Sequence, residues 1–418
     1  MLLNKARAIQ YLHQCDIDAI IAASSTHVTY LTDYRYWLDG IMRRYMTRPG
    51  ASSDLALENY AVLTADGDGA LVVPPQQMPE VEASWVSDVR VYGDLGLDES
   101  LIPTELSDRP RSWLNRMQEP RAASAIEALI GVLRDRNLDR SRLGLEFEGL
   151  PPGARLALNA ALPHATFLDC SNLLRLIRAV KSSEEIARLT QAAEIAEQAA
   201  QESLRLAAPG RALADLVLAY RVGLAQRGAD IDHLIFCIFG LGTGSEPNYR
   251  LRAGDVLLVD YGCRFRHYFS DTGLTLALGD LPATLRDRYA ALYEAEQAGV
   301  AQLRPGVLAS AVRATMRASL AARGITTCYA HGHGFGLDVR DYPIIVEDTG
   351  LRLKDDCIDV SSDLPLEADM VINLEAPLYL AGVASLHLEQ TFRVTPAGPQ
   401  PLVHQDRSRP FVPATAPS

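Results

Sequence analysis

Four acidic residues interrupt otherwise apolar strand-like segments in the C-terminal half of the chain, and this pattern limits the folds available to it. Asp260 ends the segment DVLLVDYG and Asp271 begins DTGLTLALG, while Glu375 and Glu389 lie in ADMVINLEAPLYL and ASLHLEQTFRVT. A buried carboxylate without a partner costs several kcal/mol or takes up a proton. The strands must therefore meet so that the four carboxylates share a counter-charge.

Turns between these segments would bring the carboxylates together in pairs. A hairpin about residues 265–266 places the two aspartates across from each other, and a reversal at 381–382 does the same for the two glutamates. His333, in the glycine-rich run HGHGFGLDVRDYP, supplies a neutral nitrogen ligand. We therefore predict a metal site, and carboxylates with an imidazole suit Mn, Fe(II), Co or Zn better than thiolate-binding metals.

Two further histidines fall on the same strand faces. His331 shares the face of His333 if that segment is extended, and His387 shares the face of Glu389. His387 could reach an aspartate or a substrate, and His331 could shape the site. A hydrogen-bonded structural role is the alternative for each.

The remaining sequence predicts two domains. Alternating strand, turn and helix signals over 1–172 indicate an α/β domain with a mixed sheet. Ser182 and Glu185 form a capping box that opens a long amphipathic helix, and 173–404 reads as an α+β domain. Helices are expected at 182–206, 212–226, 284–303 and 308–323. The tail at 405–418, rich in Pro, Ser and Arg, is expected to be poorly ordered.

Composition excludes some partners. The 418 residues carry a net charge of −12, which argues against nucleic acid or an anionic membrane surface. No apolar run has the length of a membrane span, and the first residues lack a secretory cleavage pattern, so we expect a cytoplasmic protein. The six cysteines are scattered, with no C-x-x-C pair, which indicates reduced thiols.

Several blocks, taken together, resemble a known family. The blocks are LVDYG with a second aspartate eleven residues on, GHGFGLDVxxYP, NLEAP and LEQTFRVTPAG, and their order and spacing are similar to the metal-ligand blocks of the prolidase, aminopeptidase P and creatinase family. The opening LxxxDIDAIIAxSxxHVTYLTDYR and the helix RAVKSSEEIARLTQAAEIA resemble its N-terminal domain and connecting helix. The resemblance covers nearly the whole chain and implies a pita-bread C-terminal domain.

The resemblance also implies roles. Asp260 and Asp271 match the terminal and bridging aspartates, His333 binds one ion, Glu375 lies beside it, and Glu389 bridges. Two divalent ions per chain are expected, most often Mn, in a homodimer. In that family a hydroxide held between the ions attacks an amide carbonyl, and the glutamate at the Glu375 position passes protons.

Three accessory positions depart from the family pattern. Thr243 stands where the peptidases carry a histidine, Arg340 and Asp341 replace a histidine and a glutamate, and His387 replaces an arginine. Arg340 can bind a carboxylate through two hydrogen bonds, which favours an anionic or zwitterionic small substrate.

An aromatic and basic cluster around Trp37 and Arg35 could shape substrate access, because in the family's dimers the N-terminal domain of one subunit often covers the other's site. A solvated surface is its alternative. The run Gly240, Gly242, Gly244 lacks a following helix and reads as a loop near the pocket rather than a nucleotide site.

Three functions remain open from the sequence. The first is a dinuclear metallohydrolase that cleaves a C–N bond in an Xaa-Pro dipeptide or in a small zwitterionic amide-like compound. The second is a lyase on the same metal site, similar to relatives that eliminate dimethyl sulfide from a sulfonium compound. The third is a binding protein that has lost catalysis. Glu375 and His387 are the predicted catalytic residues, and the predicted substrate contacts are Arg340, His331, Thr243, Trp37 and Arg35.

Overall fold

The computed structural model describes residues 1–35, 58–98, 100–151, 153–242, 244 and 248–413. The chain divides into two compact units, one comprising Met1–Arg178 with Leu353–Val360, and the other Ala179–Arg352 with Ser361–Ser418. The expected boundary near residue 172 lies inside helix α7 (Ser171–Arg178), so the first unit ends six residues later. Its second segment, 353–360, gave no sequence signal.

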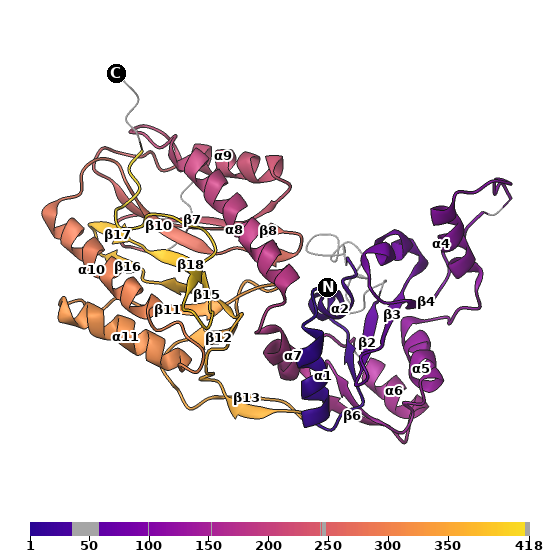
Figure 1. Ribbon diagram of the computed structural model, residues 1–418. Helices are drawn as coiled ribbons and strands as arrows, with labels where there is room; N and C mark the ends of the chain where they lie inside the picture. The colour runs from indigo at the N-terminus through magenta and orange to yellow at the C-terminus, as the bar shows by residue number, and fades with distance from the viewer. Residues whose placement is uncertain (36–57, 99, 152, 243, 245–247, 414–418) are drawn as a thin grey trace. The chain divides into compact units, whose positions relative to one another are not determined.

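The first unit is the α/β domain that the sequence predicts (Figure 1). Its six strands lie in the order β4-β3-β2-β1-β5-β6, with β1, β5 and β6 parallel and β2 antiparallel to both β1 and β3. The strands are β1 Ala19–Ala22, β2 Tyr60–Thr64, β3 Gly69–Val73, β4 Asp88–Val91, β5 Arg142–Leu145 and β6 Thr166–Asp169; the helices are α1 Lys5–Gln14, α2 Ser25–Thr32, η1 Pro75–Ala83, α4 Asp108–Gln118, α5 Ala125–Asp135, α6 Ala154–Ala161 and α7.

The second unit contains a nine-stranded sheet of the pita-bread type. Seven strands follow the order β12-β11-β15-β18-β10-β8-β7, with β19 paired to β18 and β9 to β8. They are β7 Asp230–Cys237, β8 Val256–Phe265, β9 Tyr268–Phe269, β10 Thr272–Ala277, β11 His331–Gly334, β12 Asp341–Ile345, β15 Val371–Glu375, β18 Glu389–Arg393 and β19 Gln400–Pro401. A short hairpin pairs β16 Leu378–Leu380 with β17 Ala384–Leu386. A second hairpin, β13 Arg352–Lys354 with β14 Asp359–Ser361, contains the segment 353–360 that belongs to the first unit.

Two helix pairs cover the sheet of the second unit, at the positions that the sequence predicts. They are α8 Ser183–Leu204, α9 Leu213–Gln226, α10 Ala283–Val300 and α11 Ala309–Ala322. The capping box is confirmed, since the Ser182 hydroxyl accepts from the backbone of Glu185 and the Glu185 carboxylate accepts from the backbone of Ser182. The resulting helix supplies one wall of the core.

Strand alternation assigns the two faces of this sheet different roles. Val259 and Tyr261 pack among residues of α8 and α9, while Ile372 and Leu374 pack among residues of α10 and α11. Because successive side chains point to opposite faces, the residues between them project away from the helices. The face opposite these helices therefore carries the acidic side chains, and we call it the acidic face.

The expectation of a poorly ordered tail is wrong for residues 405–413. The Arg407 guanidinium is buried, 2.7 Å from the carboxylate of Glu197 on α8 and 2.8 Å from the Tyr261 hydroxyl. The backbone of Phe411 also bonds to β10 at Thr275 and Ala277. Composition misled the prediction, because one buried arginine finds its partners only after the helix and the sheet have come together.

None of the helices in the described part of the chain has the length and apolar surface of a membrane span.

Candidate metal centre

The acidic face presents two neighbouring rows of side chains that run across the strands. In the first row, Asp260 pairs with Gly273, Gly273 with Glu389, Glu389 with Glu375, and Glu375 with His331. Members of one row share a face, because directly paired residues in antiparallel strands point the same way. Asp260, from the first predicted hairpin, therefore lies in one row with Glu389 and Glu375, from the second.

The second row lies two residues further along the strands. His233 pairs with Gly262, and His333 pairs with Asn373, which in turn pairs with Thr391. The Thr391 hydroxyl donates to the backbone carbonyl of Asp271 at 3.0 Å, which places that aspartate in the middle of the row. Both rows together bring all five predicted ligands onto one face.

The predicted register of the aspartate hairpin is wrong by one turn position. The chain reverses at Arg266 and His267, both with positive φ (49° and 72°), rather than at 265–266. Asp260 therefore opposes Gly273, and Asp271 lies diagonally two residues away. The shift is an even number of residues, so both carboxylates keep the same face. The glutamate hairpin has the predicted register, since Glu375 and Glu389 are direct partners.

His333 is held in the tautomer that a metal ligand needs. Its Nδ1 lies 2.9 Å from the carbonyl oxygen of Gly334, which can only accept, so Nδ1 carries the proton. Nε2 is left with a lone pair and lies 3.4 Å from the Asp271 carboxylate. Such outer hydrogen bonds orient metal-binding imidazoles.

Asn373 connects the ligands to one another and had no place in our sequence prediction. Its Oδ1 accepts from the backbone N–H of His333 at 2.8 Å, and its Nδ2 donates to Glu389 at 2.7 Å. It is fully buried. In the block NLEAP this asparagine stands two residues before Glu375 and therefore on the same strand face, and this spacing was the signal that could have found it.

The carboxylates divide by environment. Burial, followed by the charges of Asp271 and Glu375, raises the pKa of Glu389 well above its ordinary value. Burial acts in the same direction on Glu375 and Asp271, but the neighbouring imidazoles outweigh it. His331 and His387 lower the pKa of Glu375, and His233 and His333 lower the pKa of Asp271. Glu389 is therefore the acid that most lacks a counter-charge.

These residues fit divalent ions. Glu389 Oε2 and both ring nitrogens of His387 are buried without a hydrogen-bond partner among the described residues. Such groups are rare unless something else binds them. Carboxylate oxygens with imidazole nitrogens are ligands that Mn, Fe, Co and Zn accept.

The two additional predicted histidines contact glutamates. His331 Nε2 lies 2.7 Å from Glu375, and its Nδ1 lies 2.9 Å from the Tyr329 carbonyl. His387 is 1% exposed, and its Nε2 lies 3.7 Å from both Glu375 and Glu389. His387 is thus placed against two glutamates, while its exposure leaves little surface for a substrate.

The predicted substrate contacts are more scattered. Arg340 lies between β11 and β12, is exposed, and forms no ion pair with any residue that the structure describes. Asp341 begins β12 and is buried. Arg35 is exposed in the first unit, and Thr243 and Trp37 lie outside the described residues.

The structure adds one histidine to the acidic face. His233 Nε2 lies 2.8 Å from Asp260 and 3.4 Å from Asp271. Burial lowers the pKa of His233, but hydrogen bonds with Asp232, Asp260 and Asp271 outweigh it and raise that pKa to about 12. The only sequence signal was a charged D-x-D-H run, DIDH, entering an otherwise apolar strand.

Comparison with known proteins agrees with this geometry. The model for metallopeptidase family M24 matches residues 187–396, and the creatinase/prolidase N-terminal domain model matches residues 5–180. The chain therefore belongs to metallopeptidase family M24, and it is a metallohydrolase whose family uses divalent metal ions.

Curated relatives and solved structures share this organisation. The chain is 25% identical over 408 residues to the Xaa-Pro dipeptidase of Pyrococcus horikoshii, covering 96% of this chain and 97% of the relative. It is 26% identical over 275 residues to an uncharacterized peptidase of Bacillus subtilis, covering 64% and 74%. A dipeptidase structure from Mycobacterium ulcerans aligns with a TM-score of 0.71 at 22% identity, covering 98% and 96%, which shows the fold.

Proposed function

We propose that this chain is a dinuclear metallohydrolase that cleaves a C–N amide bond in an Xaa-Pro dipeptide or in a small zwitterionic amide-like substrate. The observation that carries the proposal is the paired row of Asp260, Glu389 and Glu375 beside Asp271, with one carboxylate oxygen of Glu389 buried and unpartnered. The dipeptidase relative, which aligns along nearly the whole chain, supports the same substrate class.

We propose that each chain binds two manganese ions, for which Fe, Co or Zn can substitute. Asp260 and Asp271 would hold one ion, and His333, Glu375 and Glu389 the other, with Asp271 and Glu389 shared. Bound divalent ions supply Lewis acidity and a more acidic water for amide hydrolysis. Four carboxylates would offset the four positive charges of two such ions, which favours two over one.

Glu375 is the proposed proton carrier. It is 13% exposed, against 2% for Glu389, so it is the more accessible of the paired glutamates. It takes the proton released when water attacks the amide carbon and returns it to the leaving nitrogen. His331, at 2.7 Å, fixes the orientation of this carboxylate.

Arg340 is the proposed substrate anchor. Its guanidinium is exposed and is not engaged by any carboxylate in the described part of the chain. A free guanidinium binds a carboxylate through two parallel hydrogen bonds. We therefore expect the substrate to have a free carboxylate, as a dipeptide or an amino-acid derivative does.

The location and assembly are also part of the proposal. We propose a homodimer on the family resemblance. We propose a cytoplasmic location because the six cysteines, all among the described residues, form no disulfide.

The decisive experiment combines elemental analysis with a substrate screen. Purified protein is expected to contain about two divalent ions per chain and to release proline from Xaa-Pro dipeptides when Mn is added. Identification of every product separates hydrolysis from elimination, because elimination leaves an unsaturated acid and consumes no water. Bound metal with no amide cleavage in any carboxylate substrate would overturn the proposal.

A matched pair of arginine variants tests the anchor. Arg340→Ala is expected to raise KM for carboxylate substrates on the order of tenfold to a hundredfold, because a charge-assisted bidentate contact contributes about 1.5–3 kcal/mol. Arg304→Ala changes another exposed arginine and should leave KM unchanged. Equal KM values in both variants would remove Arg340 from the substrate site.

A further inference from the structure

Strand β7 brings an imidazole to the aspartate end of the metal centre. His233 pairs with Gly262 on β8, in the row that also contains Asp271. Its Nε2 lies 2.8 Å from Asp260 Oδ1 and 3.4 Å from Asp271 Oδ1. These three ligand atoms lie within 4.8 Å of one another, close enough to bind a single ion.

The neighbouring residue Asp232 orients this imidazole. Its Oδ2 lies 2.7 Å from His233 Nδ1, on the opposite side of the ring from the two metal-site aspartates. A carboxylate can accept a hydrogen bond from Nδ1–H, so Nε2 can release its proton and bind an ion through the lone pair. The order carboxylate, imidazole, ion is the usual arrangement around protein-bound metals.

The strand opposite is shaped to admit the ring. A Cβ atom at Gly262 would lie 2.3 Å from the backbone carbonyl oxygen of Ser270 and 2.7 Å from Cε1 of His233, both closer than real Cβ atoms approach. A glycine also lies against an imidazole in the neighbouring row, where a Cβ at Gly273 would lie 2.4 Å from Nδ1 of His387. Each missing side chain leaves space for one imidazole beside a pair of carboxylates.

We propose that His233 is an additional metal ligand, which binds the ion held by Asp260 and Asp271, and that Asp232 orients it for this role. The proposal rests on the proposed function, since it presumes that the aspartate pair binds an ion. It gives the centre an imidazole at each end, His233 at one and His333 at the other. Added imidazole nitrogen favours Co and Zn over Mn at the aspartate end.

The proposal predicts metal affinity rather than activity alone. Zn, Co and Mn affinities of the full-length protein are measured by competition with a chromophoric chelator, together with the visible absorption spectrum of the Co(II) form. His233→Ala is expected to weaken binding of one ion by a hundredfold or more, with a larger loss for Zn and Co than for Mn, and to change the Co(II) spectrum. Asp232→Asn is expected to weaken the same ion by about 10–100-fold.

The control is His404→Ala, which removes an exposed histidine outside the metal centre and should change neither affinity nor spectrum. Far-ultraviolet circular dichroism establishes that each variant is folded. Parent-like affinity and an unchanged Co(II) spectrum in folded His233→Ala would overturn the proposal, and so would tighter binding, which would mean that the imidazole competes with the ion.

Failure of the proposed function has a different result. In that case the parent protein itself fails to bind ions, or it binds them without cleaving any amide, whatever residue occupies position 233.

Discussion

Each unit of the molecule buries a glutamate beside a histidine, and the two glutamates have opposite surroundings. In the first unit, Glu146 is 2% exposed and accepts hydrogen bonds from the backbone N–H groups of Ala23 and Ser24, with His27 Nδ1 at 2.5 Å. In the second, Glu389 is equally buried, has one bond from Asn373, and faces other carboxylates.

The pKa values follow the partners and not the burial. Burial raises the pKa of Glu146, but the charge and hydrogen bond of His27 lower it to about 2. Burial and the neighbouring carboxylates raise the pKa of Glu389. A buried carboxylate whose hydrogen bonds are all made therefore stabilises the fold, whereas one that lacks partners and lies among other acids indicates a cation-binding site.

The largest expected effect is on catalysis at the unsatisfied site. Asp271→Asn and Glu389→Gln are each expected to lower kcat/KM on the order of a thousandfold or more, equivalent to about 4 kcal/mol, because each removes a shared carboxylate. Metal content measured in parallel should fall. Without metal, Glu389→Gln should be at least as stable as the parent toward urea. Full activity in either variant would contradict the placement of Asp271 and Glu389 in a metal site.

A next effect falls on stability in the first unit. Glu146→Gln is expected to lower the free energy of unfolding by about 3 kcal/mol, because an amide cannot accept all the hydrogen bonds that the buried carboxylate forms with Ala23, Ser24 and His27. The folded pKa of Glu146 lies below the ordinary 4.5, so this stability is present above about pH 4.5 and is lost as pH falls toward 2. Urea unfolding at several pH values measures it. Metal content must stay at the parent level; a loss of metal would contradict the separation of roles.

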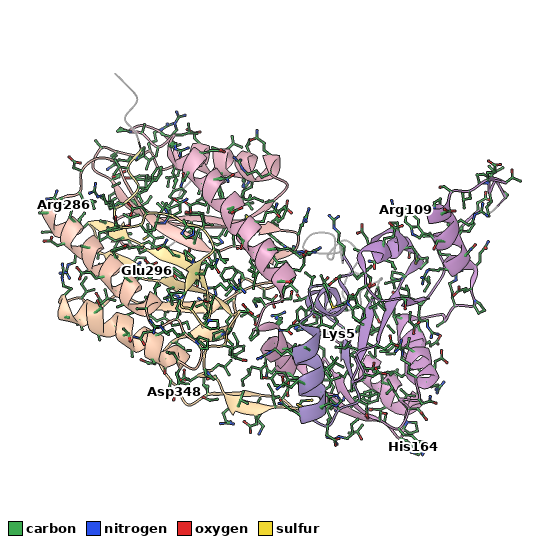
Figure 2. The ribbon with its side chains drawn as sticks, viewed as in Figure 1. Lys5, Arg109, His164, Arg286, Glu296 and Asp348 are labelled. Carbon is green, nitrogen blue, oxygen red and sulfur yellow. The ribbon has the colours of Figure 1, made fainter. Side chains whose placement is uncertain are left out.

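A third buried glutamate tests whether lack of partners alone indicates a metal. Glu296 on α10 (Figure 2) has both carboxylate oxygens buried without a hydrogen bond, and burial raises its pKa to about 8 although the charge of Arg407 opposes the shift. Glu296 belongs to neither of the metal-ligand groups found among the described residues. We therefore expect a stability cost rather than a ligand.

The sign of that cost follows from the raised pKa. The folded state keeps the Glu296 proton up to about pH 8, whereas the unfolded chain loses it near 4.5, so stability decreases as pH rises between these values. Glu296→Gln should therefore be more stable than the parent by about 3 kcal/mol at pH 7, with the difference vanishing near pH 4. Thermal or urea unfolding across this pH range checks it. A parent-like pH dependence would show that Glu296 does not titrate as described.

The smallest expected effect is that of metal removal on stability. Ions present at a hundred times their dissociation constant stabilise a folded protein by about 2.7 kcal/mol, so a chelator should lower the melting temperature of the parent. Glu146→Gln should lose the same increment, and Asp271→Asn much less. An equal loss in both variants would mean that the chelator acts elsewhere.

Local patterns in the sequence determined much of this protein. The capping box of Ser182 and Glu185, the four helices of the second unit and the direct pairing of Glu375 with Glu389 all depend on residues close together in the chain, whose spacing states the geometry. Blocks with the right order then predicted the family and the five candidate ligands. The predicted register of the aspartate hairpin was wrong by one turn position, because the two turn residues with positive φ are Arg266 and His267 and no glycine marks the turn.

Tertiary structure decided the rest, because the contacts concerned join segments far apart in the chain. His233 reaches Asp260 only when β7 pairs with β8 and Gly262 leaves room for the ring. Arg407 is buried only when α8 supplies Glu197, which composition of the tail could not reveal. Glu146 has hydrogen-bond partners, whereas Glu389 faces other carboxylates. This difference likewise depends on partners that no local spacing encodes.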